Sequence, residues 1–283
     1  MDYVTPAVGA RYLALLGANM SKINVDGPGL ALGTSGLTPI QMAAAYGAIA
    51  NEGVYLEPLS FTKVIDGDGN VVLDADQIRK SNRVYKESTA YLLVDMLTDA
   101  VKSGTGTKAK IDGMTVAGKT GTNSDYASVY FAGMTPYYVA SVFVGHDYPA
   151  NKLKNGASGG GYAAPLWKAF MEPIHEGLAN GAIIDADPTS LGLVKKTVCS
   201  VSGLLATDAC KDDEAHKPVT DWFHAASAPT AECDMHLTVA ICSDSGSLAT
   251  QFCPEDRVTK TSMILIRSDS QFAQFDDEYL MKA

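Results

Sequence analysis

The chain has 283 residues, of which 46% are apolar and 19% charged, so it can bury a core and is not a disordered tail. Its 22 basic and 32 acidic side chains give a net charge of −10, which disfavours binding to nucleic acid or to an anionic membrane surface. No apolar run approaches the roughly 18–20 residues of a membrane span, and the N-terminal sequence lacks the basic and apolar regions of a signal peptide.

Thr38 to Gln41 read as a capping box with Pro39 at the first helical position, which predicts a helix that stops near residues 51–53. Strand-like runs at residues 61–65 and 70–74 then flank a turn-forming Asp-Gly-Asp-Gly sequence. A second helix is predicted from Ser88 or Thr89 to a Gly-Thr-Gly sequence that ends it.

Three further strand-like runs follow, and the gaps between them are short. Parallel neighbours need crossovers of about a dozen residues or more, so these strands should be antiparallel. A Gly-rich loop and a helix with Pro165 in its first turn come next. This order predicts an α+β fold, in which an antiparallel sheet is flanked by helices. The three runs cover residues 114–120, 128–135 and 137–146.

Charge and cysteines are unevenly distributed along the chain. Residues 1–178 carry a net charge of −2, whereas residues 179–283 carry −8 and contain all five cysteines. Two changes of composition at one place predict a domain boundary, with a linker beginning near residue 180.

Residues 113–120 fit the pattern of a phosphate-binding loop, G-x-x-x-x-G-K-T. Such a loop needs glycine-rich backbone between a strand and a helix, so that N–H groups face the phosphates. Here the segment before Gly118 is strand-like and no helix is predicted after Thr120. We therefore reject the nucleotide-binding interpretation.

The same segment contains Lys119-Thr120-Gly121, a K-T-G motif placed on a predicted strand. In the same order along the chain come GLTPIQMAAAYGAIANEGVYLEP, SGTGTKA, VAGKTGT, FAGMTPYYVASVFVGHD and AAPLWKAFM. Together these blocks closely resemble the C-terminal half of the transpeptidase domain of class A (bifunctional) penicillin-binding proteins. The resemblance covers about residues 1–178, and the cysteine-containing tail resembles one that follows this domain in some Gram-positive members.

The resemblance implies a partial penicillin-binding, serine β-lactamase-like fold and a D,D-transpeptidase that cross-links peptidoglycan through an acyl-serine. Lys119 and Thr122 are the catalytic candidates: Lys119 supplies positive charge, and the backbone N–H of Thr122 serves the oxyanion hole. Thr120 and Gly121 are the substrate-binding candidates, since Thr120 offers a hydroxyl to the substrate carboxylate and Gly121 lets the substrate approach the backbone.

The expected partners are peptidoglycan stem peptides and β-lactams, at the extracytoplasmic cell surface. We expect no cofactor, no metal and no nucleic acid.

The chain departs from the family in its nucleophile. Its S-x-x-K string, Ser60 to Lys63, lies on a predicted strand, where an odd separation places the two side chains on opposite faces. The sequence contains no S-x-N triplet. We therefore expect a fragment that supplies the K-T-G wall of the site and is inactive alone. The alternative is a non-catalytic protein of cell-wall binding or assembly that keeps only this wall.

The tail contains an internal repeat, C-S-x-S-G-x-L-A-T-x-x-C, at residues 199–210 and again at 242–253. Two copies of one cysteine-bounded unit indicate duplication. The spacing of Cys233-x-x-His236 also suggests a zinc site. Structural zinc sites commonly use two closely spaced ligand pairs, however, and the other cysteines lie 11 positions apart within each repeat. An extracytoplasmic protein favours disulfides. We predict disulfide bonds between Cys199 and Cys210 and between Cys242 and Cys253. Cys233 then has no disulfide partner.

Overall fold

The three strands predicted over residues 114–146 form one antiparallel sheet, in the order β5-β6-β7, in the computed structural model, which describes residues 4–148 and 150–265. Lys119 pairs with Ala132 across β5 and β6, and Phe131 pairs with Val142 across β6 and β7. The antiparallel orientation expected from the short gaps is confirmed. The strands are β5 (Ala117–Thr122), β6 (Ser128–Met134) and β7 (Val139–Gly145).

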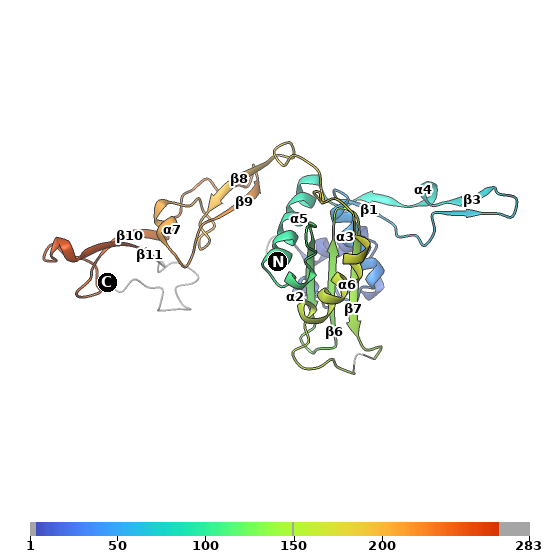
Figure 1. Cartoon of the computed structure of the whole chain (residues 1–283), viewed down its shortest axis with the longest axis horizontal. Coiled ribbons are helices and arrows are strands. Elements are labelled where there is room, and N and C mark those ends of the chain that lie inside the picture. The colour runs from blue at the N-terminus through green and yellow to red at the C-terminus, as the bar shows by residue number, and fades with distance from the viewer. Residues whose placement is uncertain (1–3, 149, 266–283) are drawn as a thin grey trace. The chain divides into compact units, whose positions relative to one another are not determined.

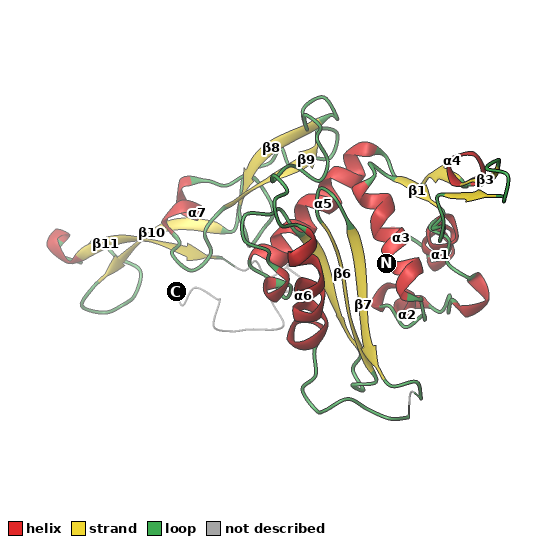
Figure 2. Ribbon diagram, turned by 45° about the vertical axis from the view of Figure 1, so that its right-hand side comes forward, coloured by secondary structure: helices red, strands yellow, loops and turns green. Residues whose placement is uncertain are grey.

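Helices cover both faces of this sheet (Figure 2). On one face, α6 (Ala164–Ile174) places the buried Trp167 ring edge-on to Phe131 with ring centroids 5.3 Å apart. Trp167 Nε1 also donates a hydrogen bond to Ala140 O at 3.1 Å. On the other face α3 (Pro39–Ala50) packs against β6 and β7. The α+β fold with an antiparallel sheet flanked by helices is therefore confirmed.

Local sequence accounts for the start of α3. Thr38 Oγ1 accepts a hydrogen bond from Gln41 N at 3.3 Å, and Gln41 Oε1 accepts one from Thr38 N at 3.0 Å, so the predicted capping box is formed. The helix ends at Ala50, and Gly53 then adopts a positive φ of 87°.

The remaining helices of the first part include α5, which begins at Glu87, just before the predicted start. The helical elements are α1 (Pro6–Leu15), η1 (Met20–Lys22), α2 (Gly27–Leu32), α4 (Ala75–Ile78), α5 (Glu87–Lys102), η2 (Thr107–Ala109) and the π-helical turn η3 (Gly159–Ala163).

Two short strand pairs accompany the main sheet, and the pair predicted around the Asp-Gly-Asp-Gly turn is present as β2 and β3 (Figure 1). The second pair, β1 with β4, was not predicted. The four strands are β1 (Val54–Leu56), β2 (Lys63–Ile65), β3 (Val71–Asp74) and β4 (Ser81–Arg83).

The chain separates into two compact units, Met1–Asp187 and Pro188–Ala283. The composition change near residue 178 lies before this division. Tyr137 OH donates a hydrogen bond to Ala179 O at 2.6 Å, and Thr115 N donates one to Asn180 Oδ1 at 2.7 Å. These contacts attach the start of the expected linker to the first unit.

The described residues of the second unit form two antiparallel strand pairs, β8 with β9 and β10 with β11, together with short helices. No helix or strand was predicted in this region. The elements are β8 (Leu193–Val198), α7 (Asp208–Asp212), β9 (Val219–His224), β10 (His236–Cys242), η4 (Glu255–Arg257) and β11 (Val258–Ile264).

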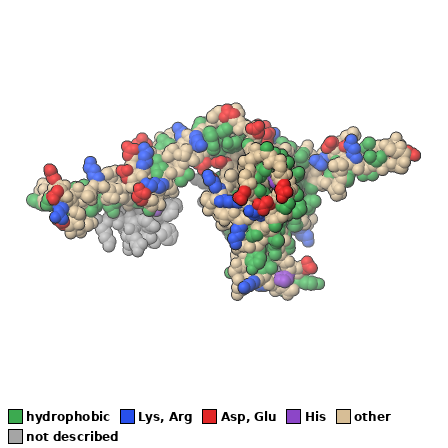
Figure 3. Space-filling view, viewed as in Figure 1, with side chains coloured by type: hydrophobic (Ala, Val, Ile, Leu, Met, Phe, Trp, Pro, Cys, Tyr) green, Lys and Arg blue, Asp and Glu red, His purple; other side chains and the backbone are tan. Residues whose placement is uncertain are grey.

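Within the described residues, no helix has both the length and the apolar character to cross a bilayer. On the face shown in Figure 3, acidic and basic side chains are interspersed in both units.

Candidate functional site

The K-T-G motif lies on β5, at one edge of the three-stranded sheet. Asn123 N donates a hydrogen bond to Ser128 O at 3.1 Å. With the register of the two strands, this bond shows which residues of β5 exchange backbone hydrogen bonds with β6. Because such pairs alternate along an antiparallel ladder, the backbone N–H and C=O of Thr120 and Thr122 point away from β6. This edge can accept an extended peptide, because its outward polar groups are those that strand addition uses.

Lys119 is exposed and its side chain bends along this edge. Its Nζ donates to the backbone oxygen of Thr120 at 3.0 Å and approaches Thr120 Oγ1 at 3.4 Å. The ammonium group therefore lies beside the outward backbone groups of β5. This position suits a cation that attracts a carboxylate lying along the strand.

Thr120 Oγ1 is 2.7 Å from Thr105 Oγ1, which comes from the loop that follows α5. This loop is part of the SGTGTKA block, but no role was predicted for Thr105 from the sequence. Together the two hydroxyls and Lys119 form a compact polar cluster at the middle of β5.

The Gly-rich loop packs backbone against backbone on the K-T-G strand. A Cβ added to Gly159 would lie 2.6 Å from Gly121 O, and one added to Gly160 would lie 2.5 Å from Thr105 O. Gly159 N donates to Thr122 Oγ1 at 3.1 Å. This close approach requires glycine at both loop positions. The hydrogen bond from Gly159 N holds the Thr122 side chain in place.

A groove of about 540 Å³ opens beside the end of β5, on the face opposite to α6. Gly121 and Thr122 line one side, and the loop at residues 32–37 lines the other. Tyr130 OH donates to Leu37 O at 2.8 Å and holds this loop in place. Burial raises the pKa of Tyr130, which keeps its hydroxyl protonated as this donor. Neither Tyr130 nor the loop was singled out from the sequence.

The other motifs do not form competing sites. Ser60 is exposed in a bend, and only Lys63 of the predicted strand segment 60–63 lies in β2, where its Nζ is 3.6 Å from Asp74 Oδ2. Neither residue is on a helix. The phosphate-loop pattern enters β5 directly, and the described residues after Thr122 form a turn rather than a helix.

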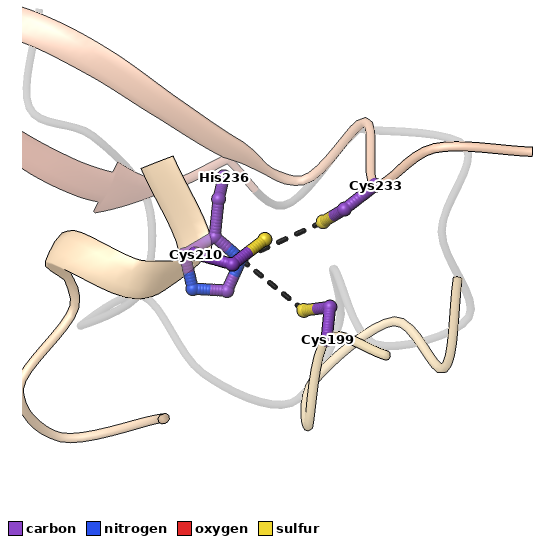
Figure 4. Close-up of side chains that lie close together, drawn as sticks. All are labelled: Cys199, Cys210, Cys233 and His236. Carbon is purple, nitrogen blue, oxygen red and sulfur yellow. Dashed lines mark hydrogen bonds between the residues drawn. The ribbon is translucent and has the colours of Figure 1, made fainter. Parts of the chain in front are cut away.

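The five cysteines are all free thiols in the structure, so the disulfide pairing stays a prediction. Cys199 and Cys210 lie with Cys233 and His236 in one buried cluster (Figure 4), a grouping the sequence reading did not foresee. Cys242 and Cys253 lie outside it.

Hydrogen bonds set the charge of groups around the cysteine cluster. Burial alone would raise the pKa of Cys233, but hydrogen bonds from Ser202 and from the backbone and ring of His236 lower it to about 6. Burial would likewise raise the pKa of Asp213, yet hydrogen bonds from His216 and His236 lower it to about 2.

Both parts of the chain match penicillin-binding protein families. Residues 18–172 match the Penicillin binding protein transpeptidase domain, and residues 190–238 match the Penicillin-binding protein 1A, C-terminal domain.

Curated relatives named Penicillin-binding protein 1A include several from clostridia and one from Aquifex aeolicus. The Clostridium perfringens protein is 34% identical over 201 residues, which is 71% of this chain and 23% of the relative. The Clostridium novyi protein is 29% identical over 287 residues, which is 99% of this chain and 32% of the relative. The chain thus spans between a fifth and a third of the length of these relatives.

Solved structures show the same fold. Penicillin-Binding Protein 1A from Haemophilus influenzae superposes with a TM-score of 0.67 at 21% identity, over 81% of this chain and 38% of that one. The penicillin-binding protein PonA1 from Mycobacterium tuberculosis gives 0.54 at 23% identity, over 64% of this chain and 53% of that one. With the match over residues 18–172, these findings confirm the resemblance, and the chain belongs to the penicillin-binding protein transpeptidase family.

Proposed function

We propose that this chain forms the K-T-G wall of a D,D-transpeptidase site that binds penicillin and cross-links peptidoglycan. The observation that carries the proposal is the edge of β5, where Lys119 Nζ lies 3.0 Å from the outward carbonyl of Thr120 and a groove begins at Gly121. A stem peptide that adds to this edge brings its terminal carboxylate to Lys119 and Thr120.

In the proposed reaction a serine oxygen attacks the carbonyl carbon between the two D-Ala residues. The negative charge that forms on the carbonyl oxygen is stabilised by the outward N–H of Thr122. The C–N bond breaks and the terminal D-Ala leaves with a proton. An amine of a second stem peptide then attacks the acyl-serine ester, forms the cross-link and releases the serine. A β-lactam follows the first step only, because its amine remains tethered.

This chain supplies the wall and not the nucleophile. Ser60 and Lys63 are separated from β5 in the sequence and do not share a helix. The proposed site therefore needs an S-x-x-K serine other than Ser60. The relatives suggest that it works at the extracytoplasmic side of the membrane, and PonA1 has been solved in complex with penicillin V.

The test uses a protein that joins this sequence to the S-x-x-K and S-x-N segments. Lys119→Ala should slow acylation by a fluorescent penicillin by about 10²–10³-fold, because it removes an electrostatic contact made in the transition state. Lys152→Ala is the matched control, since Lys152 is an exposed lysine paired with Asp125. Equal acylation rates in the two variants would reduce Lys119 to a surface lysine.

An experiment on the chain alone distinguishes the transpeptidase function from the non-catalytic alternative. We expect no penicilloyl adduct in its intact mass, because an adduct requires an activated serine. An adduct at Ser60 or another serine would contradict the division of the site. Reversible binding of peptidoglycan by the chain alone, with no Lys119 effect in the joined protein, would favour the non-catalytic wall-binding function.

A further inference from the structure

Three segments of the second unit meet at the buried cysteine cluster. Cys199 directly follows β8, Cys210 lies in α7, His236 is the first residue of β10, and Cys233 lies three residues before it. An antiparallel bridge joins Val198 to Leu205, and a parallel bridge joins Leu205 to Glu232. The fold therefore gathers side chains that are far apart in the sequence.

The four side chains converge on one point (Figure 4). Their sulfur and nitrogen atoms all lie within 4.8 Å of one another, and each residue is at most 7% exposed. Cys199 Sγ is 3.3 Å from His236 Nδ1, and Cys233 Sγ is 3.6 Å from the same nitrogen. A tetrahedral zinc site has S···N edges of about 3.5 Å and S···S edges of about 3.8 Å. The two distances agree with such edges.

The histidine is oriented by a partner outside the cluster. Its other ring nitrogen, Nε2, lies 3.0 Å from Asp213 Oδ2, and its side chain is fully buried. When Nε2–H donates to this carboxylate, the lone pair of Nδ1 points toward the sulfurs. A carboxylate behind a ligating histidine is the usual outer-shell arrangement of protein zinc sites.

The sulfurs accept hydrogen bonds from backbone N–H groups. Val201 N and Ser202 N each lie 3.4 Å from Cys199 Sγ, and Thr207 N lies 3.4 Å from Cys210 Sγ. Donors directed at sulfur offset part of the negative charge that a metal-bound thiolate keeps.

A disulfide accounts for less of this arrangement than a metal does. One bridge consumes two of the three thiols and leaves a buried cysteine and an oriented histidine without a role. Three soft sulfur ligands and one imidazole form a complete tetrahedral set, which is typical of structural Zn²⁺ and leaves no open position for catalysis.

The cluster also occupies the place of a hydrophobic core. In the described part of the second unit, the buried cluster consists of Cys199, Cys210 and Cys233, with Leu204, Ala206 and Met235 packed against it. Small units with little apolar core commonly depend on a metal or disulfides.

We propose that Cys199, Cys210, Cys233 and His236 bind one structural Zn²⁺ ion that stabilises the second unit. Binding forms three Zn–S bonds and one Zn–N bond and releases thiol protons to solvent. This proposal departs from the expectation that the chain holds no metal, and it is an alternative to the predicted Cys199–Cys210 disulfide.

The test measures metal in the full chain, purified with reductant and without added chelator. Elemental analysis should give one zinc ion per chain in the wild type and in the control variant Cys253→Ser. The zinc content of Cys233→Ser should be at least ten-fold lower. Cobalt substitution of the wild type supplies a readout that needs no variant. A tetrahedral CysS₃His site gives intense visible d–d bands and a sulfur-to-cobalt charge-transfer band.

Three results would overturn the proposal: wild-type protein that neither contains zinc nor takes up added zinc or cobalt, a Cys199–Cys210 disulfide in native peptide maps, or equal zinc in Cys233→Ser and Cys253→Ser. If Cys233→Ser fails to fold, the cobalt spectrum of the wild type decides.

Discussion

Residues 199–210 and 242–253 have one sequence pattern and share the turn that begins each copy, although only the first copy ends in a helix, α7. The first cysteine of each copy donates its N–H five residues on, to Leu204 O at 2.8 Å and to Ser247 O at 2.9 Å. Gly203 and Gly246 both turn the chain with a positive φ, of 72° and 66°. The bridge from Val198 to Leu205 has its counterpart in the bridge from Ile241 to Leu248.

The copies differ in what surrounds their cysteines. Cys210 is fully buried beside Cys233 and His236, whereas Cys253 is partly exposed and the sequence contains no Cys or His after it. Thr207 N and Thr250 N each lie 3.4 Å from the last sulfur of their copy, so the local contacts are the same. The repeated sequence therefore determines the turn, whereas residues far away in the sequence determine the surroundings of its cysteine thiols.

Removing the metal gives the largest expected difference between the copies. A strong chelator should speed hydrogen exchange in peptides covering residues 199–210 at least ten-fold, because structural zinc supplies folding free energy directly. Peptides covering 242–253 serve as the internal control and should change much less. Equal acceleration in both copies would show that the metal acts on the whole unit rather than on the 199–210 segment.

Oxidation should act on the second copy. Cys242 accepts hydrogen bonds from the backbone of Asp244 and from Cys253, which lower its pKa and favour the reactive thiolate. We therefore keep Cys242–Cys253 as the predicted disulfide, whose closed loop restricts the unfolded chain. Peptide mapping without reduction should recover this loop, and reduction should lower the denaturant midpoint of the second unit. Recovery of Cys253 bridged to Cys199 or Cys233 would contradict the separation of the two copies.

Asp213 and Asp256 occupy equivalent positions after the two copies and provide a matched pair of variants. Asp213→Asn should weaken zinc binding by about 10–100-fold, because it removes the carboxylate behind His236. Asp256→Asn should leave zinc affinity unchanged, since Asp256 is exposed and pairs with Arg257. Competition with a chromogenic chelator measures both affinities, and equal values would deny Asp213 a positioning role.

The sequence predicted what local patterns control. The Thr38–Gln41 capping box and the order of the three main strands followed from residues near one another. The zinc candidate did not, because Cys233 and Cys199 are 34 residues apart and are brought together by contacts such as the bridge from Leu205 to Glu232. Equal 11-residue spacings in the two copies suggested equal disulfides, since spacing contains no information about a third and fourth partner.

The K-T-G site shows the same limit. The K-T-G motif could be identified from the sequence. The contact between Thr105 and Thr120, however, depends on how the loop after α5 packs against β5. Tyr130 lies on a strand that the sequence predicted, but its hydrogen bond to Leu37 O joins residues that are 93 positions apart. Such contacts between distant residues, which single-sequence patterns do not encode, complete both sites.

The smallest effect tests the shared turn. Gly203→Ala and Gly246→Ala should each destabilise the second unit by about 1–2 kcal/mol, because an L-residue is strained at positive φ. No atom lies within 4 Å of a Cβ added at either position, so steric clash contributes nothing. Asparagine tolerates the left-handed conformation, and Gly203→Asn and Gly246→Asn should therefore cost less than the alanine variants. Urea unfolding followed by hydrogen exchange measures all four. A much larger cost at Gly203 would mean that the zinc cluster depends on the turn beyond its local backbone, and that the copies are less alike than their hydrogen bonds indicate.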